Sequence, residues 1–117
     1  MHHEERPWGS FTTLVDEPNH KVKTITVKAG QQLSLQSHKQ RHEYWTIVSG
    51  MGLFITGYSV EDLEHEIVRA GDCVDIPPGE IHRIKAGGED LTFIEVQLGT
   101  YFGEDDITRY EDDFGRA

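Results

Sequence analysis

The sequence predicts an all-β protein, an antiparallel β-sandwich or small barrel of the jelly-roll type. Short stretches of alternating apolar and polar residues follow one another along the chain, and Gly, Pro and Asn separate them. A helical period is almost absent. The 117 residues are expected to form one domain, 1–117, because two cores of half that length would each be too small to be stable.

The expected strands start with Lys21–Val27, where alternation places Lys23 and Ile25 on the same face. Gln32–His38 alternates again and ends on a histidine. A run of aromatic and β-branched residues, Glu43–Ser49, follows and is broken by two glycines. The remaining strands are expected over Leu53–Thr56, Glu66–Arg69, Cys73–Ile76, His82–Ala86 and Leu91–Leu98.

The two ends of the chain have a different character. Met1–Arg6 is polar and is expected to be frayed. Gly103–Tyr110 is the segment in which a helical turn or two is expected. Because a small open barrel exposes edge strands, the extended segment Trp8–Val15 is predicted to pair across a two-fold axis in a homodimer.

The charge and composition limit the partners. The chain has 11 Lys and Arg residues against 21 Asp and Glu residues, a formal net charge of −10, which argues against a nucleic-acid partner. No apolar run approaches the roughly 18 residues of a membrane span, and no signal-peptide pattern is present, so no membrane association is expected. The lone Cys73 excludes an intramolecular disulfide and, without a targeting segment, favours the cytoplasm.

Histidine and carboxylate side chains gather at strand ends. His38 ends one expected strand and Glu43 opens the next, while the turn Pro77-Pro78-Gly79 fixes His82 at the start of another. At such positions their side chains can point into the mouth of a barrel. Two imidazoles and a carboxylate in a half-apolar cavity suit a divalent transition metal.

A second pair of polar residues lies in the last expected strand. Glu95 and Gln97 share one face of Leu91–Leu98, opposite Ile94 and Val96. If that face points into the cavity, Glu95 is a candidate general base. An outward, solvated Glu95 is the alternative, and the alternation does not decide between the two.

Two segments of the chain resemble the two motifs of the cupin superfamily. The second motif, with its Pro-x-Gly turn before a histidine, is matched by Gly71, Pro77, Gly79 and His82. The first motif, His-x-His followed by Glu and, six residues later, Gly, is matched by His38, Glu43 and Gly50. The sequence departs from the first motif at its second histidine, where Gln40 stands, and in a shorter spacing to Glu43.

A narrower resemblance covers nearly the whole chain, from Arg6 to Arg116. The chain resembles the cupin domain of type II mannose-6-phosphate isomerases, which ends the bifunctional isomerase/mannose-1-phosphate guanylyltransferases. We expect the nucleotidyltransferase domain to be absent from a chain of this length. The resemblance is carried by Arg6-Pro7-Trp8-Gly9, Leu33-Ser34-Leu35-Gln36, Trp45, Ile76-Pro77, His82-Arg83, Ile94-Glu95-Val96-Gln97, Gly103-Glu104-Asp105-Asp106-Ile107 and Arg109.

The resemblance implies one divalent metal ion, which could be Mn, Fe, Zn, Co or Ni, held by His38, Glu43 and His82. Gln40 takes the place of a family histidine as a fourth ligand. Since an amide oxygen binds Zn, Ni or Cu more weakly than imidazole does, Gln40 favours Mn, Fe or an empty site. His42 could supply the missing imidazole, although alternation from Glu43 turns its side chain away.

The substrate contacts follow from the same resemblance and from charge. Arg41 matches the family's arginine beside the ligands, which implies phosphate contact or catalysis. Lys39 and Arg41 lie in the turn between the ligands and are the cations predicted to bind substrate phosphate. Gln97, on the face of Glu95, is the third predicted substrate-binding residue.

The function implied is interconversion of mannose 6-phosphate and fructose 6-phosphate, an aldose–ketose isomerisation through an enediol. Such chemistry needs a base and an electrophile, and a divalent metal would polarise the substrate oxygens. One alternative is a non-catalytic cupin that binds a metal or a sugar, which Gln40 favours. Another is a metal-dependent dioxygenase, because two His and one carboxylate also form that class of site.

Overall fold

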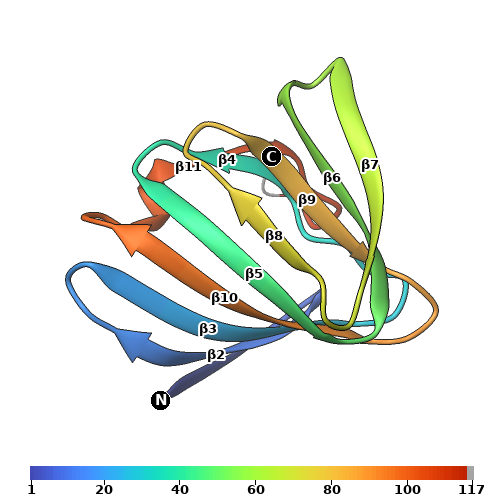
Figure 1. Cartoon of the computed structure of the whole chain (residues 1–117), viewed down its shortest axis with the longest axis horizontal. Coiled ribbons are helices and arrows are strands. Elements are labelled where there is room, and N and C mark those ends of the chain that lie inside the picture. The colour runs from blue at the N-terminus through green and yellow to red at the C-terminus, as the bar shows by residue number, and fades with distance from the viewer. Residues whose placement is uncertain (116–117) are drawn as a thin grey trace.

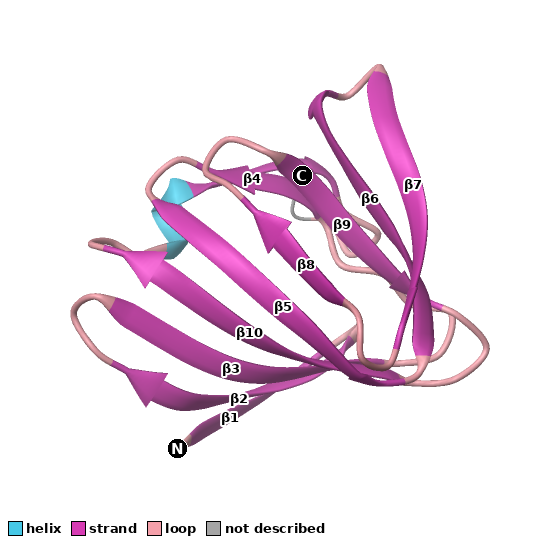
Figure 2. Cartoon of the chain, in the orientation of Figure 1, coloured by secondary structure: helices cyan, strands magenta, loops and turns pink. Residues whose placement is uncertain are grey.

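The computed structural model describes residues 1–115, and the last two residues of the predicted domain 1–117 lie outside that range. Two antiparallel sheets form the described part, one in the order β1-β2-β3-β10-β5-β8 and the other in the order β11-β4-β9-β6-β7 (Figures 1 and 2). The prediction of an all-β antiparallel jelly roll is therefore confirmed. The strands are β1 (His2–Arg6), β2 (Gly9–Asp16), β3 (His20–Val27), β4 (Leu35–His38), β5 (Arg41–Ser49), β6 (Met51–Ser59), β7 (Asp62–Arg69), β8 (Cys73–Ile76), β9 (Ile81–Ala86), β10 (Leu91–Gly99) and β11 (Ile107–Glu111).

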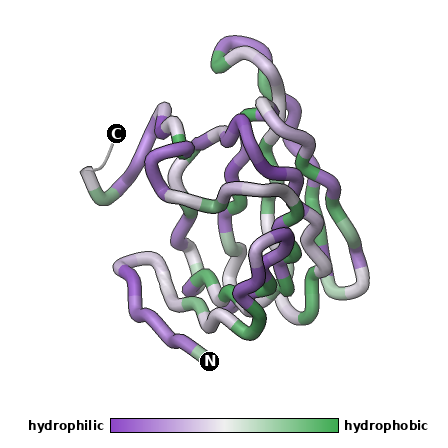
Figure 3. The backbone as a smooth tube through the Cα atoms, turned by 90° about the vertical axis from the view of Figure 1, so that its left-hand side faces the viewer, coloured by the Kyte–Doolittle hydropathy of each residue, from purple (hydrophilic) through white to green (hydrophobic). Residues whose placement is uncertain are grey.

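The pairing of β10 between β3 and β5 organises the interior. Across the three strands, Phe93 lies opposite Ile25 and Ile47, and two residues further along β10, Glu95 lies opposite Lys23 and Trp45. An apolar row and a more polar row therefore follow one another on the same inner face. The alternation of hydrophobic and hydrophilic residues along the strands is visible in Figure 3.

The core is closed by contacts between the two sheets. Trp45 stacks on Phe93, with 4.3 Å between ring centroids, and meets Phe54 of the other sheet edge-on at 5.4 Å. Because aromatic side chains bury large apolar areas, these rings contribute strongly to the stability of the fold. The buried cluster around them comprises Trp8, Ile25, Val27, Leu33, Ile47, Val68, Ile76, Ile84, Ala86 and Leu91.

The N-terminal segment corrects one expectation. Residues 2–6, predicted to be frayed, form β1, which pairs with β2 from His2 opposite Thr13 to Arg6 opposite Gly9. A side-chain hydrogen bond between His3 and Thr12 supports this pairing. Because β2 lies between β1 and β3, it is not an edge strand, so the proposed pairing of Trp8–Val15 across a two-fold axis does not fit. The homodimer itself stays a prediction.

The C-terminal tail corrects a second expectation. The predicted helical turn is a short 3₁₀ turn, Glu104–Asp106, and the rest of the segment is β11, which pairs with β4. The Asp106 carboxylate accepts the backbone N–H groups of Lys39 and Gln40, at 3.1 and 3.0 Å to the same oxygen. The tail thereby fixes the turn between β4 and β5.

No helix among the described residues is long and apolar enough to cross a membrane.

The interior packing predicts a large difference between two aromatic truncations. Phe93 is fully buried and stacked on Trp45, so Phe93→Ala is expected to lower the free energy of unfolding by about 3–5 kcal/mol. Tyr58 is 69% exposed, and Tyr58→Ala is expected to change it by no more than about 0.5 kcal/mol. Urea denaturation followed by tryptophan fluorescence measures both, and similar losses in the two variants would contradict the assigned core.

Candidate metal and substrate site

Two turns bring the histidine-bearing strands together. His38 is the last residue of β4, and the Pro77–Gly79 turn precedes His82 in β9. The backbone N–H of Gly79 donates to the carbonyl oxygen of His38 at 2.7 Å, which joins the two turns directly. Gly79 has φ of +88°, a conformation that L residues with a Cβ rarely adopt, and this explains the glycine at that position.

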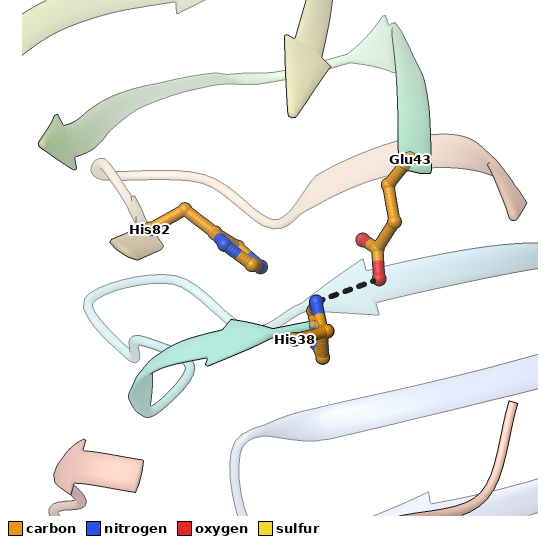
Figure 4. A group of neighbouring side chains, drawn as sticks. All are labelled: His38, Glu43 and His82. Atoms are coloured by element: carbon orange, nitrogen blue, oxygen red, sulfur yellow. Dashed lines mark ion pairs between the residues drawn. The ribbon is translucent and has the colours of Figure 1, made fainter. Parts of the chain in front are cut away.

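His38, Glu43 and His82 form a buried group of metal-ligand type (Figure 4). Each side chain is no more than 2% exposed, and one donor atom from each lies within 4.8 Å of the others. The ring centroids of the two histidines are 4.9 Å apart, and Nδ1 of His38 lies 3.4 Å from Oε2 of Glu43. The three strands β4, β5 and β9 thus bring the three predicted ligands to one point.

His82 presents an unused nitrogen to this group. Its Nδ1–H donates to the backbone carbonyl of Glu80 at 3.0 Å, which leaves Nε2 without a proton. Nε2 is buried and has no hydrogen-bond partner among the described residues. Burial lowers the pKa of His82 to about 4, so the ring is neutral near pH 7. A neutral imidazole with an unpartnered lone pair is what a transition metal requires, and the residues present fit such an ion.

His38 and Glu43 are held by Arg41. The guanidinium donates from Nε to Oε2 of Glu43 at 2.7 Å and from a terminal nitrogen to Nε2 of His38 at 2.9 Å. Trp45 Nε1–H donates to the other Glu43 oxygen at 2.9 Å. Burial, and then the nearby Arg41 charge, lower the pKa of His38 to about 2, so this ring is also neutral.

Gln40 differs from this buried group in its exposure. It is exposed, and its side chain makes no hydrogen bond within residues 1–115. The role of Gln40 as a fourth ligand stays a prediction. His42 points outward, where it hydrogen-bonds to Asp75 and stacks on Tyr44, as alternation from Glu43 predicted.

A cavity lies next to the group, on the inner face of the six-stranded sheet. Arg41 and Trp45, which both donate to Glu43, line it, as do Glu95 and Gln97. Of the two alternatives left by the sequence, the side chain of Glu95 therefore points into the interior. The remaining lining residues include Arg6, Trp8, Phe11, Lys23, Ile25, Leu33, Ser34, Gln36, Glu104, Ile107 and Arg109.

Glu95 has a strongly altered acidity. Burial, and then the negative charge of Glu43, raise the pKa of Glu95 to about 7. Gln97 Nε2 donates to Oε1 of Glu95, while Oε1 of Gln97 has no partner within the described chain. The cavity thus holds a carboxyl that gains and loses its proton near neutral pH, beside an amide oxygen that is free to accept a hydrogen bond.

Of the two predicted phosphate-binding cations, only Arg41 is among the residues that line the cavity. Arg41 lines the cavity, but Lys39 is exposed and is absent from the lining, because the Asp106 contact fixes its backbone on the outside of the turn. The cations that sequence reasoning missed are Arg6, Lys23 and Arg109. For Lys23 the signal was present, since alternation placed it on the face of the buried Ile25.

The family and its relatives are identified by comparison. The family model described as "Mannose-6-phosphate isomerase C-terminal" matches residues 1–112. The xanthan biosynthesis protein XanB of Xanthomonas campestris is 43% identical over 96% of this chain and 23% of that protein. The mannose-1-phosphate guanylyltransferase ManC of Salmonella typhimurium is 38% identical over 100% of this chain and 24% of its own length. The chain therefore spans about a quarter of the length of the curated relatives it matches.

Solved structures confirm the predicted cupin-type fold. The capsular polysaccharide assembling protein CapF of Staphylococcus aureus superposes with a TM-score of 0.82 at 25% identity, over 93% of this chain and 32% of that one. Oxalate decarboxylase of Bacillus subtilis superposes with a TM-score of 0.82 at 20% identity, over 93% of this chain and 30% of that one. The latter likeness shows the fold alone.

The acidity of Glu95 predicts how stability depends on pH. Between the ordinary pKa of 4.5 and the raised value of about 7, the folded state keeps a proton that the unfolded chain has released. The free energy of unfolding of the native protein therefore falls as pH rises through that range, because Glu95 must ionise in a buried position. In Glu95→Gln this group cannot ionise, so its contribution does not change with pH. From about pH 5 to about pH 8, the variant should gain about 1–3 kcal/mol in free energy of unfolding relative to the native sequence.

Urea unfolding of both proteins at the two pH values measures this difference, and Glu104→Gln, at an exposed carboxylate, is the matched control. A difference between Glu95→Gln and the native sequence that does not change with pH would contradict a raised pKa for Glu95.

Proposed function

Because the chain belongs to the mannose-6-phosphate isomerase C-terminal family, we propose that it is a metal-dependent isomerase that interconverts mannose 6-phosphate and fructose 6-phosphate. The observation that carries the proposal is the pairing of two features. A buried His38–Glu43–His82 group stands beside a cavity in which Glu95 has a pKa of about 7. The chain matches only about a quarter of the length of its relatives, so the proposal concerns the isomerase activity of this domain and no other activity of those proteins.

The metal would be held by His38, Glu43 and His82. Both imidazoles are neutral near pH 7, since their pKa values lie at about 2 and about 4. The lone pair of His82 Nε2 has no partner among the described residues, whereas at His38 a metal would have to compete with the hydrogen bond from Arg41 to Nε2. When bound, a divalent ion supplies Lewis-acid polarisation of the substrate carbonyl and hydroxyl oxygens. The backbone carbonyl of Glu80 would keep Nε2 of His82 directed at the ion.

Glu95 is the proposed base. An aldose–ketose isomerisation removes the proton from C2 of mannose 6-phosphate and delivers a proton to C1, with an enediol between the two steps. A carboxyl with a pKa near 7 serves in both directions, because it accepts the proton and returns it at comparable cost. Gln97 would hold Glu95 by its hydrogen bond to Oε1.

Arg41 is the proposed electrostatic partner of the reaction. Its guanidinium lines the cavity and is fixed by hydrogen bonds to Glu43 and His38. A fixed cation stabilises negative charge on a substrate oxygen without reorganisation during the reaction. The substrate face of the site would thus consist of Glu95, Gln97 and Arg41.

A non-catalytic, ligand-binding cupin is the second candidate. It is favoured by the exposed Gln40, which stands where the family has a histidine, and by Arg41, which already satisfies His38 and Glu43. In that case the cavity would bind sugar phosphate without turnover.

Metal binding and turnover are expected to depend together on His82. Purified chain supplied with Mn²⁺, Fe²⁺, Co²⁺, Ni²⁺ or Zn²⁺ should convert mannose 6-phosphate in a coupled assay, and His82→Ala should abolish both turnover and retained metal. His65→Ala, at an exposed histidine of β7, is the control and should retain both. If none of these metals supports turnover, the proposed isomerase activity is refuted, and the non-catalytic, ligand-binding cupin remains.

Removal of the proposed base should affect the chemical step. Glu95→Gln keeps the size of the side chain, so we expect kcat to fall by about 10²–10⁴-fold while metal content is retained. The native enzyme should lose activity as pH falls below about 7, because the base becomes protonated. Steady-state kinetics and elemental analysis test this, and a kcat unchanged by Glu95→Gln would exclude Glu95 as the base.

A further inference from the structure

The cavity concentrates positive charge in an acidic protein. Its lining contains four cations from four different strands and two carboxylates, whereas the whole chain has 11 Lys and Arg residues against 21 Asp and Glu residues. One of the four, Arg41, is occupied by Glu43 and His38. The other three are Arg6 of β1, which is paired with Glu4, Lys23 of β3 and Arg109 of β11.

Two of these cations converge on one aromatic ring. The Lys23 ammonium lies 4.4 Å from the centroid of the Phe11 ring, and the Arg6 guanidinium carbon lies 5.4 Å from it. Lys23 makes no ion pair within residues 1–115. Burial is the main cause that lowers its pKa, so its charge is held there at a cost that an anion would offset.

The third cation has an unused donor. Nε of Arg109 is buried and lacks a hydrogen-bond partner among the described residues. The carboxylate oxygen of Glu104 is 3.8 Å from a terminal nitrogen of Arg109, beyond a hydrogen bond. A buried arginine donor without an acceptor is costly and suits a planar or tetrahedral oxyanion.

We infer that Arg6, Lys23 and Arg109 form an anion site that takes the phosphate group of the sugar phosphate. The naming of a sugar phosphate rests on the proposed function; the anion site rests on these three side chains. The Lys23 ammonium lies over the ring of Phe11 on β2, and in the strand register Lys23 is opposite Glu95 of β10. The phosphate would bind there, and the sugar would extend toward Glu95 on β10.

Isothermal titration calorimetry on metal-free protein tests the site apart from catalysis. Mannose 6-phosphate and inorganic phosphate should bind, and mannose should bind much more weakly. Lys23→Gln and Arg109→Gln should each weaken mannose 6-phosphate binding by about tenfold or more, because each removes a charge-assisted hydrogen bond. The controls are Lys28→Gln, just after β3, and Lys85→Gln, in β9. Both lysines are exposed, and neither substitution should change the affinity for mannose 6-phosphate.

The outcomes separate this inference from the isomerase. Unchanged affinity in both Lys23→Gln and Arg109→Gln, or a loss confined to Lys39→Gln, would overturn the anion site even if the protein isomerises mannose 6-phosphate. Phosphate binding that these variants weaken, in a protein without turnover, would support the site and refute the isomerase. If a variant fails to fold, NMR of the arginine Nε–H groups in the native protein provides the test. Added phosphate should shift the Nε–H resonance of Arg109, and a resonance that does not move would contradict the anion site.

Discussion

The register between β10 and its neighbours is the constraint on which the site and the core both depend. It places Gln97 opposite Glu43 and Glu95 opposite Trp45, two residues after Phe93 of the apolar row. Side chains alternate between the faces of a strand, so a slip of one residue would turn Glu95 and Gln97 to the solvent. The same pairing that buries the aromatic core therefore holds the carboxyl whose pKa burial raises to about 7.

Buried charge is tolerated here because it is compensated over short distances. Both oxygens of Glu43 accept hydrogen bonds, one from Arg41 and the other from Trp45. His38 and His82 avoid the cost of buried charge by being neutral, which burial enforces by lowering their pKa values. The polar atoms left without partners, among them Nε2 of His82, face the places where we propose that ligands bind.

Local patterns sufficed for the fold class and for the grouping of His38, Glu43 and His82, because strand alternation, the Pro-Gly turn and histidine spacing are short-range features. Positions fixed by distant segments were not predictable. Lys39 follows a ligand in sequence, yet Asp106, more than sixty residues away, holds its turn on the outside. Arg109 reaches the cavity because β11 pairs with β4, and no local sequence pattern predicts that pairing. Met1–Arg6 looked frayed because its partner strand β2 is recognised only in three dimensions.

We propose that His38, Glu43 and His82 are the metal ligands of this domain. X-ray absorption spectroscopy at the metal edge of the Co²⁺-loaded chain tests it most directly, since imidazole rings give a characteristic scattering pattern. We expect two imidazole nitrogens and carboxylate oxygen around the ion, with one imidazole lost in His82→Ala. A spectrum with only oxygen ligands, or one that His82→Ala does not change, would contradict it.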